Sequence, residues 1–315
     1  MQLSTEIDPQ KTYRLLQLTP QLEASLREGT LDLKGGSDGS VFACTSNSTH
    51  LVRILKQTNT LLVSQAHDEH LSAFASPTSF LETNVVPGTI DWSQVPEYGK
   101  TAALPEPEIC CSQAEFEEQC RTKPAALVDG RLYSIPTSVV HNVLVHLVSS
   151  MVEAGDTDLQ MPLESLNIET GDPPEIIRAV YNKFYVESQL DLDQISKFTG
   201  IYLLSQAPQG MPKAEFVREW RLDLPVKLNT DIALLYGHIV EHDTTLKLLD
   251  HASLPTDPKL RFHKLFSIKP DWPLAEISPF IRDLVPSTQK LDAWVLKYAR
   301  KKRVHTDIYL TPLRR

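Results

Sequence analysis

The spacing of apolar residues changes once along this chain, and that change constrains the fold more than any other feature. Between residues 12 and about 95, short apolar runs such as Leu31–Leu33 and Val41–Thr45 flank turn-forming segments rich in glycine and serine. This pattern predicts β-strands. From about residue 113, apolar residues recur three and four positions apart, as in Val139–Val152, which predicts amphipathic helices. The sequence therefore predicts an α+β protein with strands first and helices after them.

The helical half of the chain divides into three blocks, which we place at residues 113–206, 207–254 and 255–315. Residues 96–112 contain three prolines and no periodic apolar pattern, so we interpret them as a linker. The last block has the clearest pattern. Its predicted helices are followed by an extended segment, which is the order of a winged helix. These helices and the segment are Pro258–Phe266, Leu274–Leu284, Thr288–Arg303 and Val304–Leu310. We therefore expect tandem winged-helix domains after the strands.

The β region, residues 1–95, is small for an independent β domain. A region of this size buries little surface, and its unpaired strand edges are a liability unless another chain covers them. We therefore expect a small β-barrel-like domain that is completed by partner chains.

The charge of the chain is acidic overall but basic near its end. The chain carries 40 acidic and 31 basic residues, a net charge of -9. Five of the seven residues in Lys297–Arg303 are nonetheless basic. Such a cluster is also typical of a cation-rich helix C-terminus or of a nuclear localisation signal. On a third winged-helix helix it would neutralise DNA phosphates. We therefore predict as DNA-binding residues Lys297, Arg300, Lys301, Lys302 and Arg303.

Motifs of catalysis are weak in this sequence. It contains no P-loop, and its four cysteines form no C-x-x-C pair. Gly35–Gly39 has the spacing of G-x-S-x-G, but it leads into a predicted strand and not a helix, so we interpret it as a hairpin turn. His238–His242 matches H-x-x-E-H, so a zinc hydrolase using His238, Glu241 and His242 is one alternative. Such a site needs a downstream acidic ligand, and Glu276 is the only glutamate after His242. We favour a helix end that carries histidines. We expect no enzymatic activity, no metal, no cofactor and, without a long apolar run, no membrane partner.

Four stretches of the chain resemble one known family. They are Thr12–Leu22, Val41–Val63, Leu254–Ile281 and Leu291–Arg303, and they lie at both ends of the chain in the expected order. Together they are similar to the defective-in-sister-chromatid-cohesion family. Members of that family are accessory subunits of the cohesion-type alternative replication factor C clamp loader.

The resemblance implies a function for each half of the chain. It implies that the β region folds with the loader's large ATPase subunit and a small third subunit. The residues that we expect at this partner contact are Tyr13, Leu15, Leu18, Val41, Phe42, Leu51, Ile54, Leu61 and Val63. It also implies a link to DNA polymerase epsilon, DNA binding through winged helices, and a nuclear role in replication-coupled cohesion. The remaining alternative is a free-standing winged-helix DNA-binding regulator.

Overall fold

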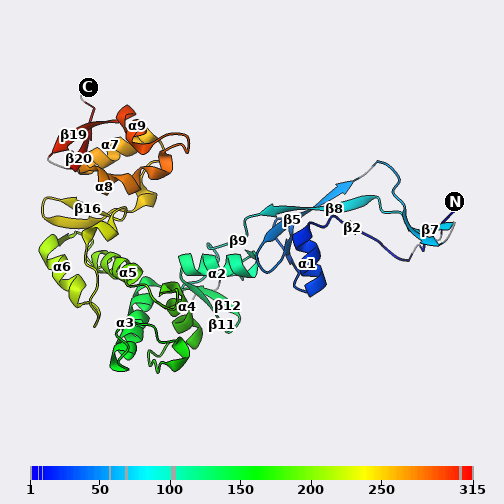
Figure 1. Ribbon diagram of the computed structural model, residues 1–315, viewed down its shortest axis with the longest axis horizontal. Helices are drawn as coiled ribbons and strands as arrows, with labels where there is room; N and C mark the ends of the chain where they lie inside the picture. Colours follow the sequence, from blue (N-terminus) through cyan, green and yellow to red (C-terminus); the bar gives the residue numbers. More distant parts are fainter. Residues whose placement is uncertain are drawn as a thin grey trace. The chain divides into compact units, whose positions relative to one another are not determined.

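The computed structural model describes residues 2–5, 7–8, 10–56, 58–67, 70–100, 104–304 and 307–313 (Figure 1). The chain divides into two compact units, Met1–Ile135 and Pro136–Arg315. Strands dominate the first unit and helices the second. The predicted α+β class is therefore confirmed.

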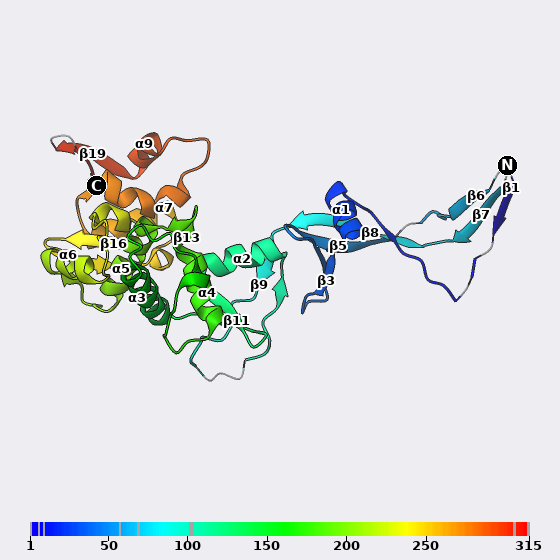
Figure 2. The ribbon, with the colours of Figure 1, turned by 60° about the horizontal axis from the view of Figure 1, so that its bottom comes forward.

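The first unit is built around a five-stranded sheet with the strand order β2-β8-β5-β4-β3. Strand β2 runs parallel to β8, and the other neighbours are antiparallel. A second sheet has the order β1-β7-β6, with β1 parallel to β7. Figure 2 shows it at the opposite end of this unit from α2. The strands are β1 Gln2–Thr5, β2 Leu15–Leu16, β3 Asp32–Gly35, β4 Val41–Cys44, β5 Thr49–Lys56, β6 Val63–His67, β7 His70–Ala75 and β8 Ser79–Val86.

A helix interrupts the predicted β region. Helix α1, Pro20–Glu28, lies beside strands β5 and β8 (Figure 1). The Thr19 hydroxyl accepts a hydrogen bond from the amide of Leu22, Pro20 occupies the first turn, and Gly29 ends the helix with a φ of 70°. These are ordinary helix start and stop signals. Interpreting all of residues 12–95 as strands and turns was therefore wrong at this position.

A half-buried carboxylate ties the second helix of this unit to the sheet. Helix α2, Gln113–Thr122, starts with a capping box formed by Ser112 and Glu115. Glu115 also accepts hydrogen bonds from the Thr49 hydroxyl of β5 at 2.5 Å and from the Gly88 amide at 2.9 Å. Burial alone would raise the pKa of Glu115, but the hydrogen bonds from Thr49, Ser112 and Gly88 outweigh burial and hold it below its ordinary value. The ionised carboxylate thus fixes α2 against the sheet.

Two short antiparallel strand pairs complete the first unit, and the second of them is a hairpin. Strands β9, Thr89–Ile90, and β10, Ile109–Cys110, form one, and strands β11, Ala125–Val128, and β12, Arg131–Ser134, form the other. Asp129 and Gly130 turn this hairpin with φ values of 51° and 80°, as the Asp-Gly pair favours.

The second unit begins with three helices that pack around an apolar core. They are α3 Thr137–Glu153, α4 Pro174–Phe184 and α5 Leu192–Ser205. A short hairpin, β13 Tyr185–Val186 and β14 Gln189–Leu190, separates α4 from α5. Helix α3 buries one side chain every three or four positions, among them Val140, Leu144 and Leu147.

The remaining two blocks of the second unit repeat one element order. In each, a short strand precedes a helix, a 3-10 segment and a hairpin, and the short strand pairs with the second hairpin strand. The strand orders are β15-β17-β16 and β18-β20-β19. The first copy consists of β15 Met211–Pro212, α6 Lys213–Leu222, η2 Ile232–Leu235, β16 Ile239–His242 and β17 Thr245–Leu248.

The second copy follows helix α7, Pro258–Ile268, and packs with it around a buried core. Its elements are β18 Trp272–Pro273, α8 Leu274–Ile277, α9 Leu291–Trp294, β19 Ala299–Val304 and β20 Asp307–Pro312. Short 3-10 segments follow α8 and α9. Phe262, Trp272, Phe280, Trp294 and Leu310 lie in one buried cluster. Among the residues that the structure describes, no helix is long and apolar enough to cross a membrane.

Candidate functional site

The structure distributes the predicted partner residues over both faces of the five-stranded sheet. Because successive side chains of a strand point to opposite faces, Val41 and Ile54 share one face, whereas Phe42 and Leu51 share the other. Leu15 lies on the edge strand β2, opposite Phe80 of β8. Tyr13 and Leu18 flank β2, Leu61 precedes β6, and Val63 is its first residue. The structure therefore does not bring all nine residues to one surface.

One face of this sheet exposes a group of aliphatic side chains. Leu33 of β3, Val41 of β4, Ile54 of β5 and Val85 of β8 are 71%, 42%, 62% and 66% exposed. The pairings Leu33 with Ala43, Val41 with Val52 and Val85 with His50 place their side chains on this face. We call Leu33, Val41, Ile54 and Val85 the apolar sheet face. Between Leu33 and Val85 on the same face, Ala43 and His50 are 1% and 0% exposed, so the four exposed side chains surround a covered part of the face.

Sequence reasoning found only half of this face. It selected Val41 and Ile54 but missed Leu33 and Val85. The alternation of Leu31–Leu33 was a signal for the first of these. Val85 could not be found without the pairing of β8 with β5, which joins residues 25 or more positions apart along most of its length.

The edge strands of the five-stranded sheet determine how readily another chain can pair with it. Among the described residues, β2 and β3 form its two edges, so the sheet is open. The Lys34 ammonium of β3 donates to the Cys111 carbonyl oxygen at 2.6 Å, close to where α2 begins. Strand β2 is only two residues long. Short edge strands and edge lysines limit uncontrolled pairing with other chains.

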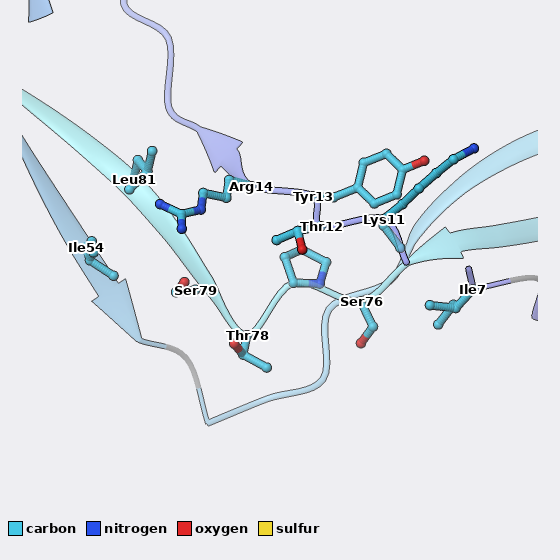
Figure 3. A pocket seen from close by; sticks show the side chains of 12 residues that line it. Ile7, Lys11, Thr12, Tyr13, Arg14, Ile54, Ser76, Thr78, Ser79 and Leu81 are labelled. Carbon is cyan, nitrogen blue, oxygen red and sulfur yellow. The ribbon is translucent and has the colours of Figure 1, made fainter. Parts of the chain in front are cut away.

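A pocket of about 380 Å³ lies where the segment before β2 passes the two long strands (Figure 3). Tyr13 and Ile54, both predicted as partner residues, line it. Lys11 and Arg14 add two cations, and the Arg14 side chain extends toward Leu81 (Figure 3). This is the place where the structure brings two of the predicted partner residues together.

The basic cluster near the chain end lies mainly on a strand. The predicted helix Thr288–Arg303 is wrong, because α9 and its 3-10 extension end at Lys297 and β19 begins at Ala299. Strand β19 pairs with β20 over its whole length, and this pairing overrides the helix propensity of its lysines and arginines. Lys297 therefore ends the 3-10 extension, and the other four predicted DNA-binding residues lie on the β19–β20 hairpin, at the edge of its block (Figure 2).

The cations of this hairpin differ in their surroundings. Lys301 forms an ion pair with Asp292 of α9, and the Lys297 ammonium donates to the Gln289 side chain at 3.0 Å. Arg300 and Lys302 are exposed, and strand alternation turns both to the face opposite Lys301. These two side chains are therefore open to solvent.

The zinc hypothesis fails on geometry. The expected helix end does not form, because Ile232–Leu235 is only a 3-10 segment and Glu241 and His242 lie on strand β16. Extended chain rises about 3.3 Å per residue, so two histidines four positions apart are too far from each other to bind one metal ion as they would on a helix. Glu241 instead accepts hydrogen bonds from Lys213 at 2.8 and 2.9 Å. No cluster of three or more metal-binding side chains occurs among the residues that the structure describes.

The four cysteines are free thiols. Burial raises the pKa values of Cys110, Cys111 and Cys120 to about 11. Such thiols stay protonated at neutral pH and are weak nucleophiles.

Similarity to known proteins spans both units. A family model described as Sister chromatid cohesion protein Dcc1 matches residues 13–281. The chain is 28% identical over 380 residues to Sister chromatid cohesion protein DCC1 of Saccharomyces cerevisiae, covering 97% of each chain. The human protein of the same name is 24% identical over 335 residues, 91% of this chain and 85% of the relative. The Xenopus laevis protein is 33% identical over 152 residues, 45% of this chain and 39% of the relative.

Proposed function

Because the chain belongs to the Sister chromatid cohesion protein Dcc1 family, we propose that it is a non-catalytic subunit of an alternative replication factor C clamp loader. The family membership that the four sequence stretches indicated is thereby confirmed. In this proposal the first unit assembles with the loader's large ATPase subunit and its small third subunit. The second unit contacts DNA and links the loader to DNA polymerase epsilon in the nucleus.

The observation that carries the assembly part of this proposal is the apolar sheet face. Its four side chains come from four strands of an open sheet and are all exposed. Covering them would remove apolar surface from water, which contributes about 25 cal/mol for each Å² buried. Strands supplied by partner chains would cover the face and extend the sheet into a barrel.

The DNA-binding part of the proposal rests on the two repeated blocks. Each has the order of a winged helix, in which a short strand joins a C-terminal hairpin. We propose that the β19–β20 hairpin is the wing of the last block and that its cations contact phosphates. The family match ends at residue 281, before this hairpin, so the role of the hairpin rests on its own residues.

Assembly is tested by co-expressing the full chain with the other two proposed subunits. Ile54→Asp combined with Val85→Asp places two charges on the apolar sheet face and is expected to abolish co-elution in size-exclusion chromatography. Arg53→Ser is the matched control, because Arg53 is the exposed neighbour of Ile54 on the opposite face. If the double variant co-elutes like wild type, the apolar sheet face is not the contact. If wild type itself elutes alone, the proposal of a loader subunit is wrong.

DNA binding is tested by measuring affinity against salt concentration. Removing two phosphate contacts with Arg300→Gln and Lys302→Gln should lower the slope of log affinity against log salt by about 2. Lys264→Gln, an exposed lysine on α7, is the control. An unchanged slope would remove the hairpin from the DNA interface. A strong preference for one base sequence would favour the free-standing regulator instead.

A further inference from the structure

A groove in the last block is separate from the surfaces proposed for assembly. It has a volume of about 450 Å³ and lies between α7 and the chain segments that flank β19 and end β20. Helix α7 contributes Lys259, Phe262, His263, Phe266 and Ser267. Lys297, Tyr298, Pro312 and Leu313 complete the lining. Pockets that hold ligands span about 300–1,000 Å³, so a groove of this size accommodates one or two large side chains.

The floor of the groove is apolar and held rigid by aromatic packing. The rings of Phe262 and Tyr298 stack with their centroids 5.4 Å apart and an interplanar angle of 12°. Phe266 packs against Phe262 at 5.9 Å, and Trp294 lies 4.9 Å from Tyr298 on the core side. Leu313 is 47% exposed at the rim. The groove therefore offers a preformed site for an aliphatic or aromatic side chain.

The rim of the groove is cationic in a chain that is acidic overall. Lys259 and Lys297 contribute two ammonium groups and His263 an imidazole, and none of the nine lining residues is acidic. Among the described residues, no ion pair joins Lys259 or Lys297 to a carboxylate, and the Lys297 ammonium donates to the neutral Gln289 side chain. An anion at the rim would therefore meet uncompensated positive charge.

From the apolar floor and the cationic rim, we propose that this groove docks an extended acidic peptide segment of a partner protein. One apolar side chain of the peptide enters above Phe266 and Leu313, and flanking carboxylates meet Lys259 and Lys297. Neither the apolar contact in the groove nor the ion pairs at its rim would bind a peptide tightly alone, because the groove is small and exposed ion pairs are weak. Together they select a short segment that is both apolar and acidic.

Single-stranded nucleic acid is the competing occupant, and the ring arrangement disfavours it. Base stacking needs an exposed aromatic face. Phe262 is only 2% exposed, and one face of Tyr298 is occupied by Phe262. Phe266 is half-buried against Phe262, so the exposed His263 imidazole is the lining ring that remains open to a base.

The test uses the full chain and a panel of fluorescein-labelled synthetic peptides. Each peptide carries one anchor, leucine, isoleucine or phenylalanine, between two Asp-Glu pairs, and a second set replaces the acids with Asn-Gln. Fluorescence anisotropy should give dissociation constants on the order of 10–100 μM for an acidic peptide, as expected for a small preformed groove. The Asn-Gln set should bind at least about tenfold more weakly, because it loses the rim contacts.

Three variants locate the binding. Ser267→Trp fills the groove from an exposed position and should abolish binding. Lys259→Glu reverses one rim charge and should weaken binding about tenfold. An acid in the first turn of α7 suits the helix dipole, so α7 should remain folded, which hydrogen exchange of its amides can verify. Lys264→Glu is the matched control. It makes the same charge change on the same helix outside the groove and should alter affinity no more than about twofold.

The outcomes separate the two occupants. If no acidic peptide binds more tightly than its Asn-Gln counterpart, or if Ser267→Trp leaves binding intact, the proposal is wrong. An unlabelled oligothymidylate of about 15 nucleotides serves as the nucleic-acid probe. If it binds wild type, is lost in Ser267→Trp and no peptide binds, the groove is a nucleic-acid site and the peptide proposal is overturned.

Discussion

Arg261 is the buried cation on which the last block depends, and replacing it with methionine should destabilise that block. The residue is 2% exposed. Its Nε donates to the Pro255 carbonyl oxygen at 2.6 Å, and its Nη1 donates to the Phe280 carbonyl oxygen at 3.0 Å. Nη1 also lies 2.7 Å from both carboxylate oxygens of Asp283. Methionine keeps the apolar stem and the approximate volume but removes every donor.

The expected loss follows from these partners. A hydrogen bond from a charged donor contributes about 1.5–3 kcal/mol, and two carbonyl acceptors lose such a donor in Arg261→Met. Asp283 is 45% exposed, so water rehydrates its carboxylate and the loss of this ion pair adds little. We therefore expect Arg261→Met to cost about 3–4 kcal/mol. Asp283→Asn should cost only about 1 kcal/mol, because the two carbonyl contacts of Arg261 remain.

Native-state hydrogen exchange measures this loss within the block, which matters because a chain with two units need not unfold in a single step. At about 1.36 kcal/mol for each tenfold change, 3 kcal/mol corresponds to roughly 150-fold faster exchange of the protected amides. The affected amides are those of α7 and β20. Lys264→Met, an exposed change on α7, should alter exchange by less than about threefold.

Two results would refute this reasoning. If Arg261→Met accelerates exchange less than about tenfold, the buried hydrogen bonds do not hold the block together. If Asp283→Asn is as damaging as Arg261→Met, the ion pair and not the carbonyl contacts supplies the stability.

Three further predictions concern other buried contacts. His141 Nε2 lies 3.0 Å from an Asp223 carboxylate oxygen, so a double-mutant cycle with His141→Gln and Asp223→Asn should give a coupling free energy of about 1–2 kcal/mol; additivity would contradict this. Burial lowers the pKa of His50 below 6.5, so the first unit should lose stability as the pH falls from 6.5 through the folded pKa. Between about pH 7.5 and about pH 5.5, the β5 amides should lose less protection against hydrogen exchange in His50→Gln than in wild type. Equal losses of protection would exclude His50 as the cause of the pH dependence. A Cβ on Gly200 would lie 2.9 Å from the Trp220 ring, so Gly200→Ala should destabilise α5 by about 1–2 kcal/mol despite its better helix propensity, whereas slower exchange in α5 would show that the contact relaxes.

Local chemistry explains which elements could be predicted from sequence. Helix α7 begins where Asp257 and Pro258 supply a cap and a first-turn proline, and Asp129 and Gly130 form the turn between β11 and β12 that an Asp-Gly pair favours. In these cases the residues that decide the structure are adjacent in sequence. The Thr288–Arg303 prediction failed for the opposite reason, because β19 exists through its pairing with β20, and lysines and arginines by themselves favour a helix.

The candidate site was only partly predictable for a related reason. Adjacent residues such as Val41 and Phe42 were both selected as partner residues, but they point to opposite faces of the sheet. Which of the two faces is exposed depends on where helices α1 and α2 pack. Neither helix is part of these strands, so the alternation within a strand does not reveal it. The two lysines of the peptide groove lie 38 positions apart, on α7 and just before β19, so no local pattern joins them.

The parallel pairings of the first unit also set an order of events during synthesis. Strands β1 and β2 are made first, yet they pair with β7 and β8, which end only at Ala75 and Val86. Contacts between residues so far apart in sequence form slowly and require most of the unit to be available. Strands β1 and β2 must therefore wait, without their strand partners, until β7 and β8 have left the exit tunnel. During that interval nascent-chain chaperones have access to these strands, and pauses in translation after β8 would favour correct pairing.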